Sequence, residues 1–146
     1  MNIVLFGATG MMGSRIAAEA AARGHNVTAV SRSGQQPDGE GVLVVSVVGD
    51  ARNAAQVAEL VQDADVVAAA LVPPRDGSDP RAPFVQLYAD FLSGIRDGGA
   101  PRTVIVGDEI LPGASHISAE DYAVAFVDEL ESGAHPRQRL SVAQAA

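Results

Sequence analysis

The 146-residue sequence predicts an α/β fold built on a doubly wound parallel sheet. The first observation is an apolar run, residues 3–6, that leads directly into a glycine-rich turn and an alanine-rich helix. The second is the alternation of short apolar runs with segments of helical periodicity. The third is a hydrophobic content of 47%, which suits one buried core in a chain too short for two full domains. We therefore expect residues 1–146 to form a single domain.

The expected elements follow one another in a strand–helix rhythm. Strands are predicted at residues 3–6, 25–32, 42–48, 65–72 and 102–106, helices at 14–23, 53–62, 84–96 and 117–131, and a short terminal strand at 139–143. Loops are expected at residues 33–41, 75–83 and 108–116. Because crossovers between parallel strands are right-handed, the strands should form a Rossmann-like sheet in the order 3-2-1-4-5. A ligand is then expected at the carboxyl edge, where the strand order reverses.

Local features of the sequence predict each of these strands and helices. The strands are continuous apolar runs, such as VLVVSVV at 42–48, which are typical of parallel strands covered on both faces. Gly24 is suited to end the first helix, and Ser118 is suited to cap the last one. The helices repeat apolar residues at helical spacing: Ile16, Ala17, Ala20 and Ala21; Ala54, Val57, Ala58 and Val61; Phe84, Leu87, Tyr88, Phe91, Leu92 and Ile95; and Tyr122, Ala123, Phe126, Val127 and Leu130.

The glycine-rich turn has the chemistry of a pyrophosphate site. Gly7 permits a tight turn, Gly10 lets the backbone approach a ligand, and Gly13 lets the helix pack closely on the strand. The free N–H groups at the helix start would then face the anion. A purely structural glycine turn is the alternative. We assign to this site the residues of the turn, namely Gly7, Thr9, Gly10, Met11, Met12 and Gly13.

The end of the second strand bears on the choice of dinucleotide. An NAD site usually has an acidic residue there, whereas this chain has Ser31 and Arg32. Arginine can pair with a 2′-phosphate, so we expect NADP to be preferred over NAD about ten- to a hundredfold. The alternative is that Arg32 is a solvated surface residue.

Two further segments are candidates for the adenosine end of the site. Asp50 can accept from the adenine amino group, and it can equally initiate the following helix. The small residues Ala69 and Ala70, with Leu71, are suited to line the adenosine–ribose wall, although plain sheet packing would use the same residues.

Three blocks of the sequence resemble the NAD(P)H-binding atypical short-chain dehydrogenase family, the group of NmrA-like and NADH–flavin reductase-like proteins. These blocks are GATGMMG with its preceding strand, Gly49-Asp50 after the third strand, and ISAEDYAVAFVDELE followed by RQRLSVA. The resemblance implies a dinucleotide-binding domain. After the strand at 102–106 the chain departs from the family pattern, because about one βα unit and a strand are missing.

Composition restricts the partners. The net charge of −8 argues against a nucleic-acid partner, and no segment has the length of a membrane span or the form of a signal peptide. Cysteine is absent, so thiolate chemistry is excluded. We expect a cytoplasmic protein. We also expect no metal site, since Glu120 and Asp121 lie in the first turn of a helix and His116 alone does not complete a ligand set.

The sequence assigns no catalytic residue. Typical short-chain dehydrogenases, in contrast to the atypical family that the chain resembles, use a tyrosine followed four residues later by a lysine, and this chain contains no lysine. Tyr88 and Tyr122 fit helix faces. His25 starts a strand, and Asp108, Glu109 and His116 fit a solvated loop. Two functions stay open: an NADPH-dependent reductase acting on a small-molecule flavin or quinone acceptor, and a non-catalytic NADP(H)-binding sensor.

The missing unit predicts an unprotected sheet edge. The strand at 102–106 should lie at the edge with unpaired backbone groups, which template pairing with another chain. We therefore expect a homodimer with this strand and its flanking helices at or near the contact. The alternative is that the terminal strand at 139–143 pairs with this edge, in its own chain or in a partner.

Overall fold

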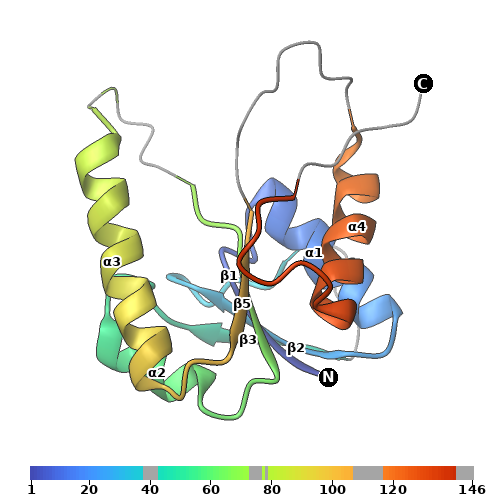
Figure 1. Cartoon of the computed structure of the whole chain (residues 1–146), viewed down its shortest axis with the longest axis horizontal. Coiled ribbons are helices and arrows are strands. Elements are labelled where there is room, and N and C mark those ends of the chain that lie inside the picture. The colour runs from blue at the N-terminus through green and yellow to red at the C-terminus, as the bar shows by residue number, and fades with distance from the viewer. Residues whose placement is uncertain (38–42, 73–76, 78, 107–116, 141–146) are drawn as a thin grey trace.

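The computed structural model describes residues 1–37, 43–72, 77, 79–106 and 117–140. One parallel sheet separates two pairs of helices, giving three layers (Figure 1). The strand order is β3-β2-β1-β4-β5, which confirms the predicted fold class and topology. The strands are β1 (Asn2–Phe6), β2 (Asn26–Ser31), β3 (Val44–Val48), β4 (Val66–Ala69) and β5 (Arg102–Ile105).

The central strand β1 is apolar on both faces because it is covered on both. Ile3 lies opposite Val27 of β2 and Val66 of β4, and the parallel register continues to the ends of these strands. Successive side chains alternate between the two faces, so Ile3 and Leu5 enter one core while Val4 and Phe6 enter the other.

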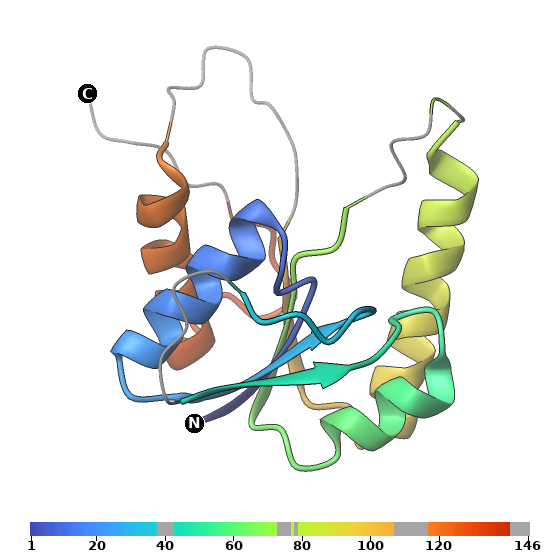
Figure 2. The same ribbon diagram turned by 180° about the vertical axis from the view of Figure 1, so that it is seen from behind.

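Helices α1 (Met11–Ala22) and α4 (Ala119–Ser132) cover one face of the sheet (Figure 2). They present small and branched side chains to it, and this core is formed by Ile16, Ala17, Ala20, Ala123, Phe126, Val127 and Leu130 against β1, β2 and β4. Alanines in α1 let the helix lie close to the strands. The α1–α4 pair therefore positions the start of α1 at the carboxyl edge of the sheet.

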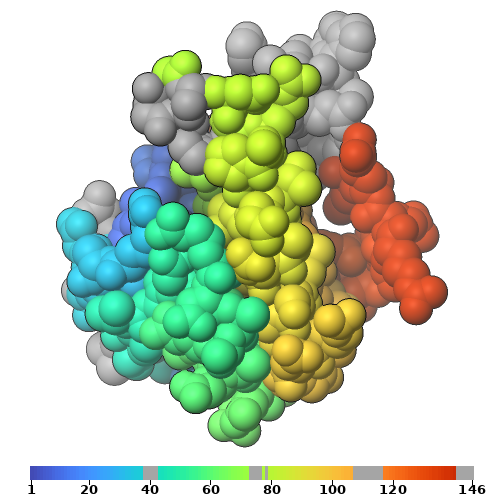
Figure 3. Space-filling model, turned by 90° about the vertical axis from the view of Figure 1, so that its left-hand side faces the viewer, coloured from blue at the N-terminus to red at the C-terminus, as the bar shows by residue number. Residues whose placement is uncertain are grey.

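Helices α2 (Ala54–Val61) and α3 (Arg81–Asp97) cover the other face side by side (Figure 3). Gly94 within α3 and Gly98 at its C-cap allow the close contact, since a Cβ on Gly94 would lie 2.6 Å from the carbonyl oxygen of Ala54. A Cβ on Gly98 would lie 2.7 Å from that of Ala58. Phe91 of α3 packs edge-on against Phe6, with 5.0 Å between ring centroids.

Arginine side chains from α1, the turn after it and β5 attach α4 to the rest of the molecule. Arg23, after α1, donates to the carboxylates of Glu19 and Asp128, both at 2.7 Å, and these bonds raise the pKa of its guanidinium. At the other side of α4, Arg102 of β5 donates to the backbone carbonyls of Glu129 and Leu130. The last turn of α4 is thereby capped by a side chain from the sheet edge.

Two helices start three residues earlier than predicted. Helix α1 begins at Met11 rather than residue 14, because Gly10 itself is the N-cap. Helix α3 begins at Arg81 rather than residue 84, so the predicted loop at 75–83 is wrong for its last three residues. Pro83 is accommodated because the N–H that proline lacks has no intrahelical partner in a first turn.

The predicted terminal strand at 139–143 is not observed in its described part, since Arg139 and Leu140 are irregular. Its remaining residues, and the loop predicted at 108–116, lie outside the described residues. Among the described helices, none is long and apolar enough to cross a membrane.

Strand β5 lies at one edge of the described sheet, as the sequence predicts, and β3 lies at the other. The homodimer stays a prediction, and the two edges allow it to be tested. Ile105 of β5 is 40% exposed, and Val45 of β3 is 60% exposed. We expect a dimer mass at micromolar concentration by light scattering coupled to size exclusion, and Ile105→Arg should give a monomer.

Val45→Arg is the matched control, because it places the same charge on the opposite edge strand and should leave the dimer intact. A monomer mass for the unaltered protein, or a dimer lost only with Val45→Arg, would contradict contact through β5.

Candidate functional site

The glycine turn between β1 and α1 is tight for reasons internal to the fold. Gly7 has φ +78°, and a Cβ there would lie 2.4 Å from the carbonyl oxygen of Ala70. A Cβ on Gly13 would lie 2.0 Å from the carbonyl oxygen of Gly7. Both positions therefore exclude a side chain, since no real Cβ approaches backbone atoms so closely.

At position 10, by contrast, no contact within the fold requires a glycine. Its φ of −73° and ψ of 169° suit any residue. The nearest atom to a Cβ placed there is the Gly7 carbonyl oxygen at 3.5 Å, an ordinary contact. The fold would accept a side chain at this position, whereas a ligand lying on the backbone would not. Gly10 is thus the one glycine of the three whose identity is explained by an approaching ligand.

The start of α1 presents unneutralised N–H groups beside Gly10. Within the described structure, Gly10 makes no side-chain cap and the first turn of α1 contains no acidic residue. The first backbone bond of the helix is Ser14 N–H to the Gly10 carbonyl at 2.9 Å, which leaves the N–H groups of Met11, Met12 and Gly13 available. An anion at this position would accept these donors and be stabilised by the helix dipole.

Helix α4 shows the opposite arrangement. The hydroxyl of Ser118 accepts from the N–H of Asp121 at 3.0 Å, and Glu120 and Asp121 supply negative charge in its first turn. Its N-terminus is therefore already satisfied, while that of α1 is open to a ligand.

The carboxyl ends of β1, β2 and β3 meet beside the glycine turn. Gly7 N–H donates to the Val30 carbonyl at 3.3 Å, and Gly49 N–H donates to the Ser31 carbonyl at 2.9 Å. Ser31 is only 8% exposed, and its hydroxyl has no hydrogen-bond partner among the described residues. A buried hydroxyl left unpaired costs about 1–3 kcal/mol. Together with the cradle at Gly10, this orphaned group fits a ligand that carries hydroxyl or phosphate oxygens.

Arg32 and Asp50 follow β2 and β3 at the same edge. Arg32 is exposed, and Asp50 is half-buried. The carboxylate of Asp50 accepts from the backbone N–H of Arg52 at 2.9 Å and from its Nη2 at 2.8 Å. These bonds hold the pKa of Asp50 below its usual value, and the charge of Arg32 acts in the same direction.

The structure corrects one interpretation of Asp50. The cap of α2 is Asn53, whose side chain accepts from Gln56 N–H at 3.2 Å, so Asp50 does not initiate the helix. Sequence analysis did not single out Arg52 as the partner of Asp50. The signal was present in the spacing, because an aspartate readily accepts from the backbone N–H two residues later.

The end of β4 borders the same turn. Ala70 N–H donates to the Phe6 carbonyl at 2.9 Å, which places the Ala70 carbonyl against Gly7. Ala69 is fully buried in the core on the α2–α3 side, whereas Leu71 is partly exposed. Among these three residues, Leu71 is therefore the one with a side chain available to a ligand. Thr9, Met11 and Met12 are exposed or partly exposed on the turn itself.

The tyrosines considered for catalysis belong to aromatic packing. Tyr88 lies edge-on between Phe84 and Phe91, at 5.0 Å and 6.1 Å between ring centroids. Burial raises the pKa of its phenol, so the hydroxyl stays protonated at neutral pH. Tyr122 stacks on Phe126 in α4 with ring centroids 6.3 Å apart.

His25 lies at the wrong edge for this site. It precedes β2, so it lies at the amino edge of the sheet, while the glycine turn lies at the carboxyl edge. Its Nε2 contacts Glu131 at 2.8 Å and its Nδ1 contacts the N-terminal amine of Met1 at 3.0 Å. His25 therefore joins α4 to the start of β1.

The other polar candidates for catalysis lie outside the described residues. Asp108, Glu109 and His116 belong to residues that the structure does not describe. In the described ranges, no group of three His, Asp or Glu side chains is placed to hold a metal ion.

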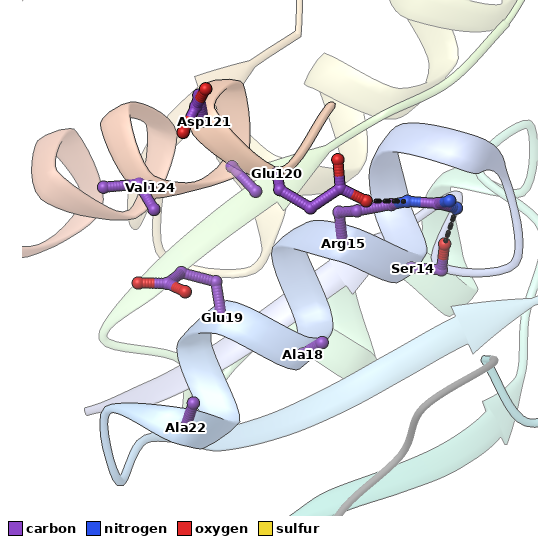
Figure 4. Close-up of a pocket in the computed structure, with 9 residues that line it drawn as sticks. Ser14, Arg15, Ala18, Glu19, Ala22, Glu120, Asp121 and Val124 are labelled. Atoms are coloured by element: carbon purple, nitrogen blue, oxygen red, sulfur yellow. Dashed lines mark hydrogen bonds and ion pairs between the residues drawn. The ribbon is translucent and has the colours of Figure 1, made fainter. Parts of the chain in front are cut away.

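A surface groove runs between α1 and α4, apart from the carboxyl ends of the strands (Figure 4). Arg15 spans it, donating to Glu120 at 3.3 Å and to the Ser14 hydroxyl at 3.3 Å. Glu19, on the same groove, is paired with Arg23. Arg15, Glu19 and Glu120 of the groove are thus engaged in ion pairs.

The comparisons with known proteins agree with this geometry. Residues 7–131 match the model of a family described as NAD(P)H-binding. A candidate exported protein from Burkholderia pseudomallei is 30% identical with a TM-score of 0.72, over 92% of this chain and 95% of that one. A candidate epimerase from Bacteroides thetaiotaomicron is 24% identical with a TM-score of 0.75, over 92% of each chain.

A candidate NADH-flavin reductase from Streptococcus pneumoniae is 21% identical with a TM-score of 0.57, over 92% of this chain and 95% of that one. A search of proteins with curated functions found no match.

Gly10→Val should separate ligand binding from folding. Two methyl groups would occupy the space above the turn, so dinucleotide binding measured by calorimetry should be lost. The backbone conformation at Gly10 accepts valine, so the main cost is a poorer N-cap for α1 and the thermal unfolding midpoint should fall by no more than about 4 °C.

Gly13→Ala provides the contrasting variant, because its Cβ would collide with the Gly7 carbonyl oxygen 2.0 Å away. It should lower the free energy of unfolding by about 2 kcal/mol. Unaltered dinucleotide affinity in Gly10→Val would show that the pyrophosphate does not lie on this turn.

Proposed function

The chain belongs to the family of NAD(P)H-binding domains, and on that premise we propose that it is an NADPH-dependent reductase with a flavin or quinone acceptor. The observation that carries the proposal is the open start of α1 beside Gly10. A glycine that the fold does not need, next to three N–H groups without a partner among the described residues, suits the pyrophosphate of a dinucleotide.

The residues at the adenosine end of the site support NADP rather than NAD as the cofactor. Arg32 is exposed at the end of β2, where an NAD site usually has a carboxylate that binds the ribose 2′-hydroxyl. A guanidinium instead forms charge-assisted bonds with a 2′-phosphate. The Ser31 hydroxyl, which has no partner within the described part of the chain, lies in the preceding position and would offer a donor to the same ribose.

The acceptor is proposed from a row of aromatic rings that leads away from the glycine turn. Phe6 ends β1, Phe91 packs on it, and Tyr88 and Phe84 continue the row along α3. Phe84 and Tyr88 are partly exposed, so part of the row is open to solvent. Planar conjugated molecules pack favourably on such rings, which supports a flavin or a quinone as the acceptor.

The residues of this chain bind and orient rather than transfer protons. When bound, NADPH supplies a hydride, and a flavin or quinone accepts it with little acid–base assistance from the protein. Gly10 and the start of α1 would hold the pyrophosphate, and Arg32 and Ser31 would hold the ribose end. Tyr88 transfers no proton in this scheme, so its protonated phenol needs no neighbouring lysine.

A non-catalytic NADP(H) sensor is the second candidate. The absence of lysine from the sequence and the packing of both tyrosines against aromatic neighbours favour it, because the usual proton-transfer pair of short-chain dehydrogenases cannot form. The two candidates share the dinucleotide site and differ in turnover.

Arg32→Ala should identify the source of the cofactor preference. We expect the unaltered protein to bind NADP about ten- to a hundredfold more tightly than NAD, and the variant to lose that preference while NAD affinity stays unchanged. Calorimetric titration with each cofactor measures both constants. Equal affinities for NADP and NAD in the unaltered protein would exclude a 2′-phosphate site at Arg32.

Turnover distinguishes the reductase from the sensor. The unaltered protein should oxidise NADPH steadily when free flavin or a quinone is added. The reaction is measured by the loss of absorbance of the reduced nicotinamide. Gly10→Val is the background control, because it should retain the fold and lose the cofactor. NADPH binding without oxidation above that background would favour the sensor.

A further inference from the structure

We propose that Arg52, held in place by Asp50, determines cofactor specificity by binding the 2′-phosphate of NADP together with Arg32. This inference rests on the proposed function and adds a second cation to the adenosine end of the same site.

The side chain of Arg52 is fixed by a two-pronged contact. Its Nη2 lies 2.8 Å from one carboxylate oxygen of Asp50, and its Nε lies 3.1 Å from the other. The guanidinium has five N–H donors, of which this contact uses two. The side chain is 59% exposed, so the remaining donors are accessible to a ligand. Asp50 thus sets the orientation of a guanidinium that keeps most of its binding capacity.

Arg32 follows β2, and Arg52 lies in the turn that follows the neighbouring strand β3. Gly49 N–H donates to the Ser31 carbonyl, which joins the ends of β2 and β3 directly before Arg32 and Asp50. Both guanidiniums lower the pKa of Asp50, Arg52 by direct hydrogen bonds and Arg32 by its charge. A phosphate next to Arg32 would therefore lie within the field of both cations.

The charge of the protein makes a second cation useful. The net charge is −8, and NADP is itself polyanionic, so the long-range field of the chain opposes binding. Arg32, Arg52 and Asp50 together carry a net charge of one positive unit at the ends of β2 and β3. With Arg32 alone beside Asp50, the two charges would offset each other and the attraction for a 2′-phosphate would be weaker.

The Asp50–Arg52 contact is not needed for folding. Exposed ion pairs contribute little to stability. The backbone N–H of Arg52 donates to Asp50 at 2.9 Å and would do so with any side chain at this position. Arg52→Ala therefore removes the cation and preserves the local turn.

The test uses two fragments of the cofactor. Adenosine 2′,5′-bisphosphate carries the 2′-phosphate, and adenosine 5′-monophosphate lacks it. Arg52→Ala should weaken binding of the bisphosphate about tenfold and leave binding of the monophosphate unchanged, as measured by calorimetry. The loss should diminish at high salt, since it arises from charge. A structural role for Arg52 would instead weaken both fragments equally.

Arg81→Ala is the matched control. Arg81 makes the same type of contact with the aspartate two residues before it, with its backbone N–H 3.0 Å and its Nε 3.3 Å from Asp79 Oδ1. It lies at the start of α3, and its loss should change neither fragment. Arg52→Lys keeps the charge without the two-pronged geometry and should restore part of the bisphosphate affinity.

The outcomes separate this inference from the proposed function. An unaltered protein that binds both fragments equally has no 2′-phosphate site, and the NADP preference itself is then wrong. A preference for the bisphosphate that survives Arg52→Ala overturns only the role of Arg52. Full restoration by Arg52→Lys would overturn the positioning role of Asp50.

Discussion

The contact between Gly13 and the carbonyl oxygen of Gly7 is the constraint on which the rest of the structure depends. A Cβ at Gly13 would lie 2.0 Å from that oxygen, so helix α1 can start this close to β1 only with glycine. The close approach places the first N–H groups of α1 over the carboxyl edge of the sheet. It also sets the path of α1 across β1 and β2, on which α4 packs. One backbone contact therefore determines both the anion-binding end of the molecule and the layer that covers it.

Much of the fold could be predicted because the strands are buried on both faces and their apolar runs are continuous. Element starts were less predictable, since they depend on contacts between segments: Pro83 enters α3 only because it falls in a first turn. At the site, the roles of Gly7 and Gly13 followed from the spacing of the motif. The pairing of Asp50 with Arg52 did not, because a carboxylate followed by an arginine two residues later is common in solvated loops. The assignment of the site residues to a cofactor stays a prediction.

The arrangement separates binding from chemistry. The groups suited to hold a dinucleotide are backbone N–H groups, a buried hydroxyl and guanidiniums, which bind and orient a ligand. The aromatic row formed by Phe6, Phe91, Tyr88 and Phe84 offers a packing surface. A domain of this kind can orient two reactive molecules, and it can also report the presence of one. Both functions place the same demand on the glycine turn, which explains why fold and motif alone do not distinguish them.

The attachment of α4 has a consequence for how the chain folds. Arg23 binds Asp128 across 105 residues of sequence, and Arg15 binds Glu120 across the same separation. Contacts so distant in sequence form late, because the entropy of closing a long loop opposes them. Until α4 arrives, the apolar face of the sheet beside α1 lacks half of its cover. The segment synthesised after β5 therefore completes the layer against which the first helix is packed, and a nascent chain that ends before α4 would expose that face to aggregation.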